Sequence, residues 1–324
     1  MATVLRIDNL HKRYGAIHAV NDLSLEVQAG EVYGILGPNG SGKTTTLGMI
    51  LSIIKPDSGT YTWFPDEKGV WKGDYKRSNV GNVIDSSTAS GRSREAQNTA
   101  ARQRIGTLLE TPNFYPYLDA VENLRITALI KRLPQTNFDD ILQQVNLYER
   151  RNSPFSSYSL GMKQRLAIAA AMIGDPDILI FDEPTNGLDP QGIVEVRNLI
   201  LAIARQGKTI IMASHILAEV ERICTHVAIM KRGRLLSTGR VGSIMGEQTT
   251  VEIGADDMTA LYGLLQSHTG VRSIERDGAI YLLQLTEGHE AKALNRQAHQ
   301  QGILLTHLVT RSKSLEAEFL EITS

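Results

Sequence analysis

The stretch Gly37-Pro38-Asn39-Gly40-Ser41-Gly42-Lys43-Thr44 fits the pattern G-x-x-x-x-G-K-[ST], and this pattern decides the fold. An apolar run ends at Leu36 as a predicted buried strand, and apolar residues at helical spacing follow the stretch. Glycines let backbone N–H groups surround phosphate oxygens, Lys43 supplies a cation, and the Thr44 hydroxyl can ligate Mg²⁺. A second threonine, Thr45, follows and supports the same pattern. We predict a phosphate-binding loop between a strand and a helix. The alternative is a glycine-rich turn that caps an ordinary helix.

Composition excludes several classes of protein. The chain has 324 residues, of which 42% are hydrophobic and 21% charged, enough for one large core and a small second domain. A net charge of -1 offers no basic footprint, so nucleic-acid binding is not expected. No apolar run approaches the roughly 20 residues that span a bilayer, and no signal segment precedes the first strand, so a cytoplasmic protein is expected. With one cysteine, Cys224, intramolecular disulfides are excluded.

Two further strands end in polar residues that point to the same site. The apolar run 178–181 ends in Asp182 and Glu183, and the run 209–213 is followed by Ser214 and His215. Ligands of open α/β sheets bind at the carboxyl ends of the strands, so both pairs are expected beside the phosphate loop. A lone histidine at a strand end is usually structural, but His215 shares its edge with the loop and the two acids.

Two other residues admit a functional and a plain interpretation. The ring of Tyr14 could stack on a purine at one edge of the site, or it could be a half-buried tyrosine in a turn. Ser159 is the expected N-cap of an alanine-rich helix. The start of this helix is a potential anion site, or the helix is an ordinary capped one without a ligand.

The chain is expected to form two domains, 1–241 and 242–324. Within the first, the polar stretch 65–101 is interpreted as an insertion of unassigned function, and 112–172 as a mainly helical part with a capping box at Asp119 and Glu122. The second domain follows the order strand, helix, strand, strand, helix, strand, which is a βαββαβ unit, and it ends in an amphipathic segment. It carries no catalytic constellation.

With these motifs in this order, the first 240 or so residues resemble the nucleotide-binding subunit of an ABC transporter. The segments that match are 37–45 with the Walker A motif, 178–183 with Walker B, 158–162 with the family signature, 186–189 with the D-loop, and His215 with the switch histidine. Tyr14 takes the adenine-stacking position. The resemblance implies an α/β P-loop NTPase core, with an antiparallel β subdomain and a helical signature subdomain.

The resemblance also implies cofactors and partners. Two ATP molecules would lie between two head-to-tail copies of the chain. Each ATP bound to the phosphate loop of one copy would face Ser159, Gly161 and Asp189 of the other copy. A separate membrane permease would hold the pair of copies at the inner face of the membrane. Asp182 would hold Mg²⁺ and Glu183 would polarise the attacking water. His215 would orient water and γ-phosphate, and Lys43 would neutralise phosphate charge.

Two departures from the family pattern bear on function. The signature reads Tyr-Ser-Leu-Gly-Met where the family usually has Leu-Ser-Gly-Gly-Gln, but it keeps Ser159 and Gly161. Glu110 stands where the family usually has a glutamine, as in the branch that resembles bacitracin-resistance and related drug or lipid exporters, and it is expected near the metal. Export is therefore favoured over uptake.

Two alternatives remain from other functional classes. A soluble ABC ATPase of translation or DNA repair usually has tandem ATPase domains or a long coiled-coil insertion, and this chain has neither. A regulatory module without hydrolysis is disfavoured because both Glu183 and His215 are present. The transported compound cannot be read from this chain.

Overall fold

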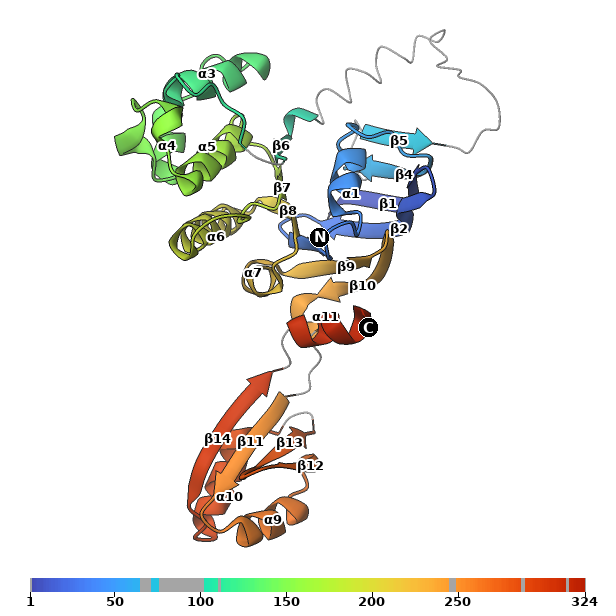
Figure 1. The fold of residues 1–324 in the computed structure, drawn as a ribbon, viewed down its shortest axis with the longest axis vertical. Helices are drawn as coiled ribbons and strands as arrows, with labels where there is room; N and C mark the ends of the chain where they lie inside the picture. Colours follow the sequence, from blue (N-terminus) through green and yellow to red (C-terminus); the bar gives the residue numbers. More distant parts are fainter. Residues whose placement is uncertain are drawn as a thin grey trace. The chain divides into compact units, whose positions relative to one another are not determined.

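A computed structural model describes residues 2–64, 71–75, 102–109, 112–244, 249–286, 289–312 and 315–323. The chain divides into two compact units, Met1–Gly239 and Arg240–Ser324, each with a core of its own. Figure 1 shows the elements of both units.

A six-stranded sheet forms the centre of the first unit, in the order β10-β9-β3-β8-β7-β6. Its strands are β3 (Val32–Leu36), β6 (Ile105–Leu108), β7 (Ile178–Asp182), β8 (Thr209–Ser214), β9 (His226–Lys231) and β10 (Arg234–Arg240). The strands β9, β3, β8, β7 and β6 pair in parallel. Every residue of β3, β7 and β8 is buried, as expected for parallel strands covered on both faces.

An antiparallel sheet of order β2-β1-β4-β5 packs onto this centre. It consists of β1 (Thr3–Tyr14), β2 (Ile17–Gln28), β4 (Ser58–Trp63) and β5 (Trp71–Tyr75). Leu23, Leu25 and Val27 alternate with exposed residues along β2, so one face of the sheet is buried. That face shares one hydrophobic core with the parallel strands and with helix α1 (Lys43–Ile50).

Strands β4 and β5 form an antiparallel hairpin in which Trp63 pairs with Trp71. The rest of the predicted insertion, 65–70 and 76–101, lies outside the described residues.

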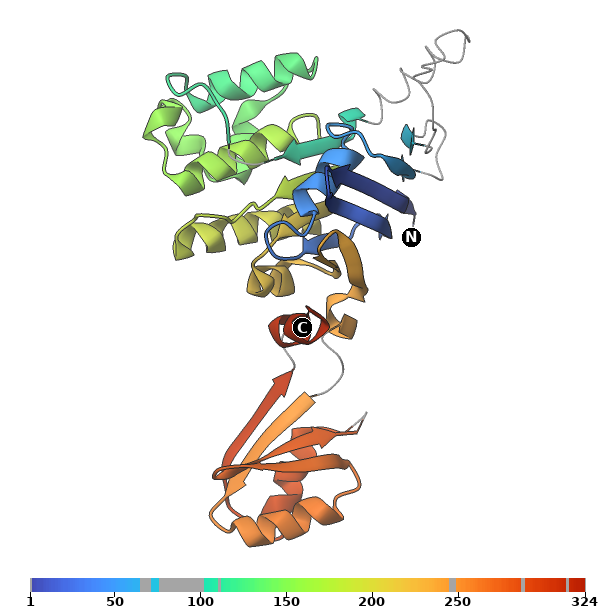
Figure 2. The same ribbon diagram turned by 45° about the vertical axis from the view of Figure 1, so that its right-hand side comes forward.

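Helices cover the other parts of the first unit. They are α3 (Ala120–Ile130), α4 (Phe138–Gln144), α5 (Leu160–Met172), α6 (Pro190–Arg205) and α7 (Leu217–Ile223), with short 3₁₀ turns at Tyr148–Arg150 and Phe155–Ser157. The predicted capping box is present, since Asp119 and Glu122 each accept the backbone N–H of the other. Figures 1 and 2 show α3, α4 and α5 on one side of the parallel strands and the antiparallel sheet on the other.

The second unit is the predicted βαββαβ fold. It contains β11 (Thr249–Ala255), α9 (Met258–Ser267), β12 (Val271–Asp277), β13 (Ile280–Leu285), α10 (Ala291–Gln300) and β14 (Leu305–Ser312), with α8 (Val241–Ile244) before them and α11 (Leu315–Thr323) after them. The sheet order is β12-β13-β11-β14, and all its pairs are antiparallel. Val251, Ile253 and Leu283 face the helices and are buried.

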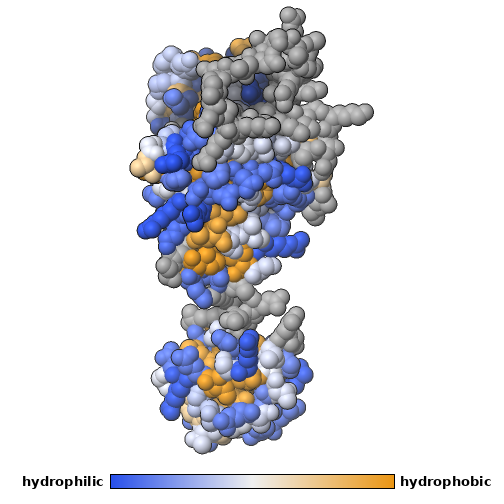
Figure 3. Space-filling view, turned by 90° about the vertical axis from the view of Figure 1, so that its right-hand side faces the viewer, coloured by the Kyte–Doolittle hydropathy of each residue, from blue (hydrophilic) through white to orange (hydrophobic). Residues whose placement is uncertain are grey.

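Part of this unit's surface is apolar. Leu304 and Val309 are exposed large hydrophobic residues of its last strand region, and Tyr262 is exposed on α9. Figure 3 shows a patch of hydrophobic atoms on one face of the βαββαβ body, surrounded by hydrophilic side chains.

Candidate functional site

The predicted phosphate loop connects the end of β3 to the start of α1. A Cβ atom on Gly37 would lie 2.4 Å from the Met230 carbonyl oxygen, and one on Gly42 would lie 2.2 Å from that of Ala19. Only glycine fits at these two positions. Gly40 differs, because no atom lies within 4 Å of the position that its Cβ would take; its φ of +80° still favours glycine. The loop is therefore packed against the fold at its two ends and open to a ligand at its middle.

Lys43 is folded back across this loop. Its side chain is buried, and its Nζ donates to the Gly37 carbonyl oxygen at 2.8 Å and to that of Pro38 at 3.4 Å. The ammonium group is thus held inside the curve of the loop, at the place where the sequence pattern predicts phosphate.

The start of α1 is suited to an anion. Its N-cap, Gly42, has no side chain to accept a hydrogen bond, and the first turn contains no acidic residue. Thr44 is exposed and Thr45 half-buried. Ser41 Oγ is buried and has no hydrogen-bond partner in the described part of the chain. Free amides at a helix start and a buried hydroxyl fit the oxygens of a phosphate group.

The strand register brings the acidic pair and the histidine to this loop. Leu36 pairs with Ser214, and Ala213 pairs with Asp182, so β3, β8 and β7 end side by side. Asp182 is buried, with 3% of its surface exposed, whereas Glu183 and His215 are more accessible. This register places the carboxyl ends of the three strands at one edge, as the sequence predicts.

Glu183 joins the other two residues in one chain of contacts. Its Oε1 lies 3.4 Å from Lys43 Nζ, and its Oε2 accepts from His215 Nδ1 at 2.8 Å and from the His215 backbone N–H at 3.3 Å. Its own backbone is left-handed, with φ of 50°. The sequence predicted a common edge but not these contacts, because they depend on that backbone conformation.

Two other predicted residues, Ser159 and Asp189, cap helices. Ser159 caps α5 by accepting the Met162 N–H, and Asp189 caps α6 by accepting the Gly192 N–H. The two helix starts are adjacent, since a Cβ on Gly161 would lie 3.7 Å from Gly192 Cα. In the described part of the chain, no hydrogen bond or ion pair joins them to Lys43, Glu183 or His215.

Two predicted positions remain, Tyr14 and Glu110. Tyr14 is half-exposed at the end of β1, where the Lys12 Nζ lies 5.2 Å from its ring centroid. Glu110 lies outside the described residues.

The residues present fit a nucleotide and a divalent cation. The loop supplies backbone amides and one buried ammonium group for phosphate, as described above. The Thr44 hydroxyl and the Asp182 carboxylate are hard oxygen donors of the kind that Mg²⁺ prefers. Asp182 lies at the end of β7 and Thr44 in the first turn of α1.

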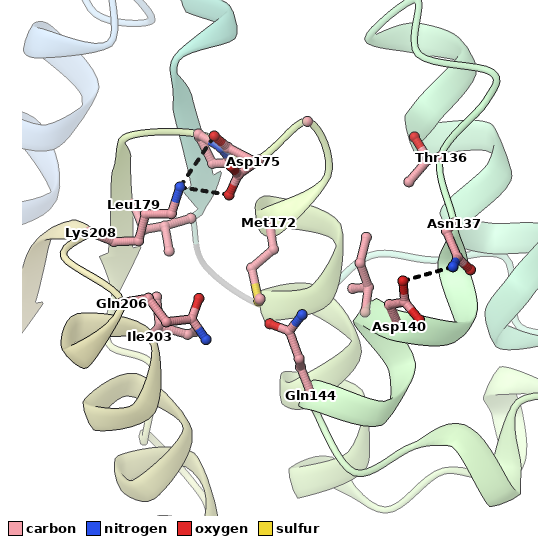
Figure 4. Close-up of a pocket in the computed structure, with 13 residues that line it drawn as sticks. Thr136, Asn137, Asp140, Gln144, Met172, Asp175, Leu179, Ile203, Gln206 and Lys208 are labelled. Carbon is pink, nitrogen blue, oxygen red and sulfur yellow. Dashed lines mark hydrogen bonds and ion pairs between the residues drawn. The ribbon is translucent and has the colours of Figure 1, made fainter.

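A cavity of about 390 Å³ lies at the amino ends of the parallel strands, at the opposite end of the sheet from the phosphate loop (Figure 4). Asp175 and Lys208, which precede β7 and β8, form an ion pair of 2.6 Å on its wall. Met172 and Ile203, near the ends of α5 and α6, give it an apolar side. Because it lies at the amino ends of the strands, this cavity is separate from the predicted phosphate site.

Comparison with known proteins gives consistent matches. The family model described as "ABC transporter" matches residues 20–186. The bacitracin transport ATP-binding protein BcrA of Bacillus licheniformis is 35% identical over 99% of this chain and 98% of its own length. The Nod factor export ATP-binding protein I of Cupriavidus pinatubonensis is 30% identical over 100% of this chain and 91% of its own length.

Solved structures match about three quarters of this chain. The structure of cbiO1 from Clostridium perfringens, part of the ABC transporter complex cbiONQ, superimposes with a TM-score of 0.61 at 26% identity, and the match covers 76% of this chain and 92% of that one. A dimeric ATP-binding cassette, MJ0796, bound to ADP and Pi superimposes with a TM-score of 0.56 at 24% identity, covering 73% and 98%. The second likeness shows the fold alone. Within the described ranges, no helix is both long and apolar enough to cross a bilayer.

Proposed function

This chain belongs to the ABC transporter family, as an ATP-hydrolysing subunit, and from that premise we propose that it powers a separate membrane permease in export. The observation that carries the proposal is the contact chain of Lys43, Glu183 and His215 beside the glycine loop. It unites a phosphate-binding cation with a carboxylate and an imidazole at one sheet edge.

Each of the three residues has a role in hydrolysis. Lys43 binds phosphate oxygens in place of the carbonyl and carboxylate oxygens that it contacts here. Glu183 then accepts a hydrogen bond from the attacking water and polarises it, since a carboxylate within reach of water is a suitable general base. His215, held by Glu183, orients the water and the γ-phosphate. Positioning and charge neutralisation supply most of the acceleration.

Mg²⁺ would be held by Thr44 and Asp182, where it would neutralise phosphate charge. Glu110 is proposed to lie close to this cation, two residues after the end of β6. The adenine ring is proposed to stack on Tyr14, which is half-exposed at the end of β1.

The complete site is proposed to need two copies of the chain. Among the described residues, no hydrogen bond or ion pair joins Ser159 or Gly161 to the loop of their own chain, and Ser159 and Leu160 are exposed at the start of α5. In a head-to-tail homodimer, this helix start and Asp189 face the nucleotide on the partner's loop. Each ATP would then be bound between a loop from one copy and a signature helix from the other.

The proposal of export rests on the relatives of this chain and not on the geometry of its site. The names of two relatives refer to bacitracin transport and to Nod factor export. We propose that this chain energises export of a drug, a lipid or a similar compound, from the cytoplasmic face of the membrane. The domain 242–324 is proposed to regulate or to dimerise, because the predicted catalytic and nucleotide-binding residues all lie before it.

Steady-state turnover of ATP by the purified chain tests the catalytic assignment. Lys43→Ala should lose nucleotide binding, because the loop then lacks its cation. Glu183→Gln should bind ATP but turn over about 10²-fold or more slowly, because the amide is a poor base. Measuring ATP affinity and turnover separately checks that the two defects differ. Equal turnover of Glu183→Gln and the unaltered chain would contradict the role of Glu183.

A further inference from the structure

Helix α6 makes two ion pairs that point in nearly opposite directions. Glu195 Oε2 lies 3.4 Å from Arg165 Nη2 on α5, and Arg197 Nη1 lies 3.1 Å from Glu219 Oε1 on α7. Two positions along an α-helix differ by about 200° around its axis, which explains the opposite directions. Charged side chains therefore link α6 to the helix on either side of it.

The pair on the α7 side is buried. The side chains of Arg197 and Glu219 are 12% and 8% exposed. Glu219 Oε2 is buried and has no hydrogen-bond partner among the described residues. Removing two charges from water is costly, and an ion pair with one oxygen unsatisfied recovers little of that cost. Stability alone therefore does not account for this pair.

The geometry of α7 points to a different role. The helix has seven residues, and its N-cap, Ile216, makes no side-chain cap. Glu219 lies in its first turn, and His215 comes four residues earlier. The Arg197 contact thus anchors the turn that follows His215. Both contacts of His215 with Glu183 Oε2, at 2.8 and 3.3 Å, would weaken steeply if this turn moved by about 1 Å.

Helix α6, which carries Arg197, is also connected to Glu183 along the chain. This helix begins after its N-cap, Asp189, six residues beyond Glu183, and Pro184 and Thr185 between them are buried. Glu183 is therefore fixed to the start of α6, and His215 is fixed to the start of α7. The Arg197–Glu219 pair joins these two helices.

We propose that Arg197 and Glu219 are positioning residues for ATP hydrolysis, which hold His215 against Glu183 through helix α7. The inference rests on the proposed function for Glu183 and His215. In the part of the chain that the structure describes, neither Arg197 nor Glu219 has a hydrogen bond or ion pair with the phosphate loop, so we expect nucleotide affinity not to depend on them.

The test replaces both charges at once, in Arg197→Met/Glu219→Met, which keeps side chains of similar length and leaves no unpaired buried charge. We expect kcat to fall about tenfold while KM for ATP stays within about twofold, because only the reacting geometry changes. The melting temperature should stay within a few degrees. The control is Lys208→Met, which removes an ion pair at the other edge of the sheet and should leave kcat unchanged.

A second comparison separates positioning from a general structural effect. In a His215→Ala background, the double substitution should change kcat less than twofold, because the group that it positions is already absent. The inference would be overturned if the double substitution lowered kcat by the same factor in the His215→Ala background as in the unaltered chain. An unchanged kcat in Arg197→Met/Glu219→Met would also overturn it. If that variant does not fold by circular dichroism, Glu219→Gln is measured in the same two backgrounds. An unaltered chain that does not hydrolyse ATP would overturn the proposed function as well.

Discussion

Glu183 combines a site side chain with a left-handed backbone, at φ of 50°. A residue with a Cβ atom in this conformation costs about 1–2 kcal/mol, and glycine avoids the cost. We therefore expect Glu183→Gly to be about 1 kcal/mol more stable than Glu183→Ala, after allowance for the greater freedom of glycine in the unfolded chain. Both variants lack the carboxylate, so the difference reports the backbone alone. Urea unfolding at 25 °C measures it, and equal stabilities would contradict a strained backbone at this position.

At the same scale, the residue types of the site were predictable and their contacts were not. The glycine pattern and the two acids after an apolar strand are local signals, so positions 37–45, 182 and 183 stand out in the sequence. The Lys43–Glu183–His215 contacts join three segments that are far apart in the chain. They depend on the register of β3, β7 and β8 and on one unusual φ angle, which no local pattern specifies.

At the scale of elements, the end of helix α5 is capped by a lysine from another helix. Lys131, which ends α3, donates through Nζ to the carbonyl oxygens of Ala170, Ala171 and Ile173 at 3.3, 3.3 and 2.9 Å. The ammonium group offsets the negative end of α5. Burial lowers the pKa of Lys131 to about 8.

This pKa gives a dependence of stability on pH. Between about pH 8 and pH 10.5 the unfolded chain keeps a proton on Lys131 that the folded chain has lost, so folding is favoured as the pH rises through this window. Relative to Lys131→Met, the free energy of unfolding of the unaltered chain should increase by roughly 3 kcal/mol at most. Urea titrations of both proteins at pH 7.5 and 9.5 measure the change. Parallel pH curves for the two proteins would contradict the lowered pKa.

Local sequence signals again explain which features of the elements could be predicted. The capping box of α3 follows from Asp119 and Glu122, three residues apart. The cap on α5 does not, because Lys131 and its acceptors are about 40 residues apart and meet only in the packed helices. The βαββαβ order was predictable from the alternation of apolar patterns, whereas the strand order β12-β13-β11-β14 is a property of the folded sheet.

At the scale of the whole molecule, the two units have separate hydrophobic cores. The core of the first contains residues up to Met230 and a packed neighbour at Leu235, and the core of the second begins at Val251. We expect a chain ending at Gly239 to fold and to bind ATP with an affinity within about threefold of the full chain. Circular dichroism and ATP titration measure this. A folded truncated chain without ATP binding would give the second unit a part in the nucleotide site.

In the proposed mechanism, two copies of this chain bind ATP between them. Size-exclusion chromatography with light scattering measures it most directly, on Glu183→Gln, which should keep ATP bound because it hydrolyses ATP slowly. With ATP, this variant should have twice the mass of a single chain, and without nucleotide the mass of one chain. Lys43→Ala/Glu183→Gln is the control and should stay monomeric in both conditions. A Glu183→Gln protein that binds ATP and remains a monomer would contradict the account.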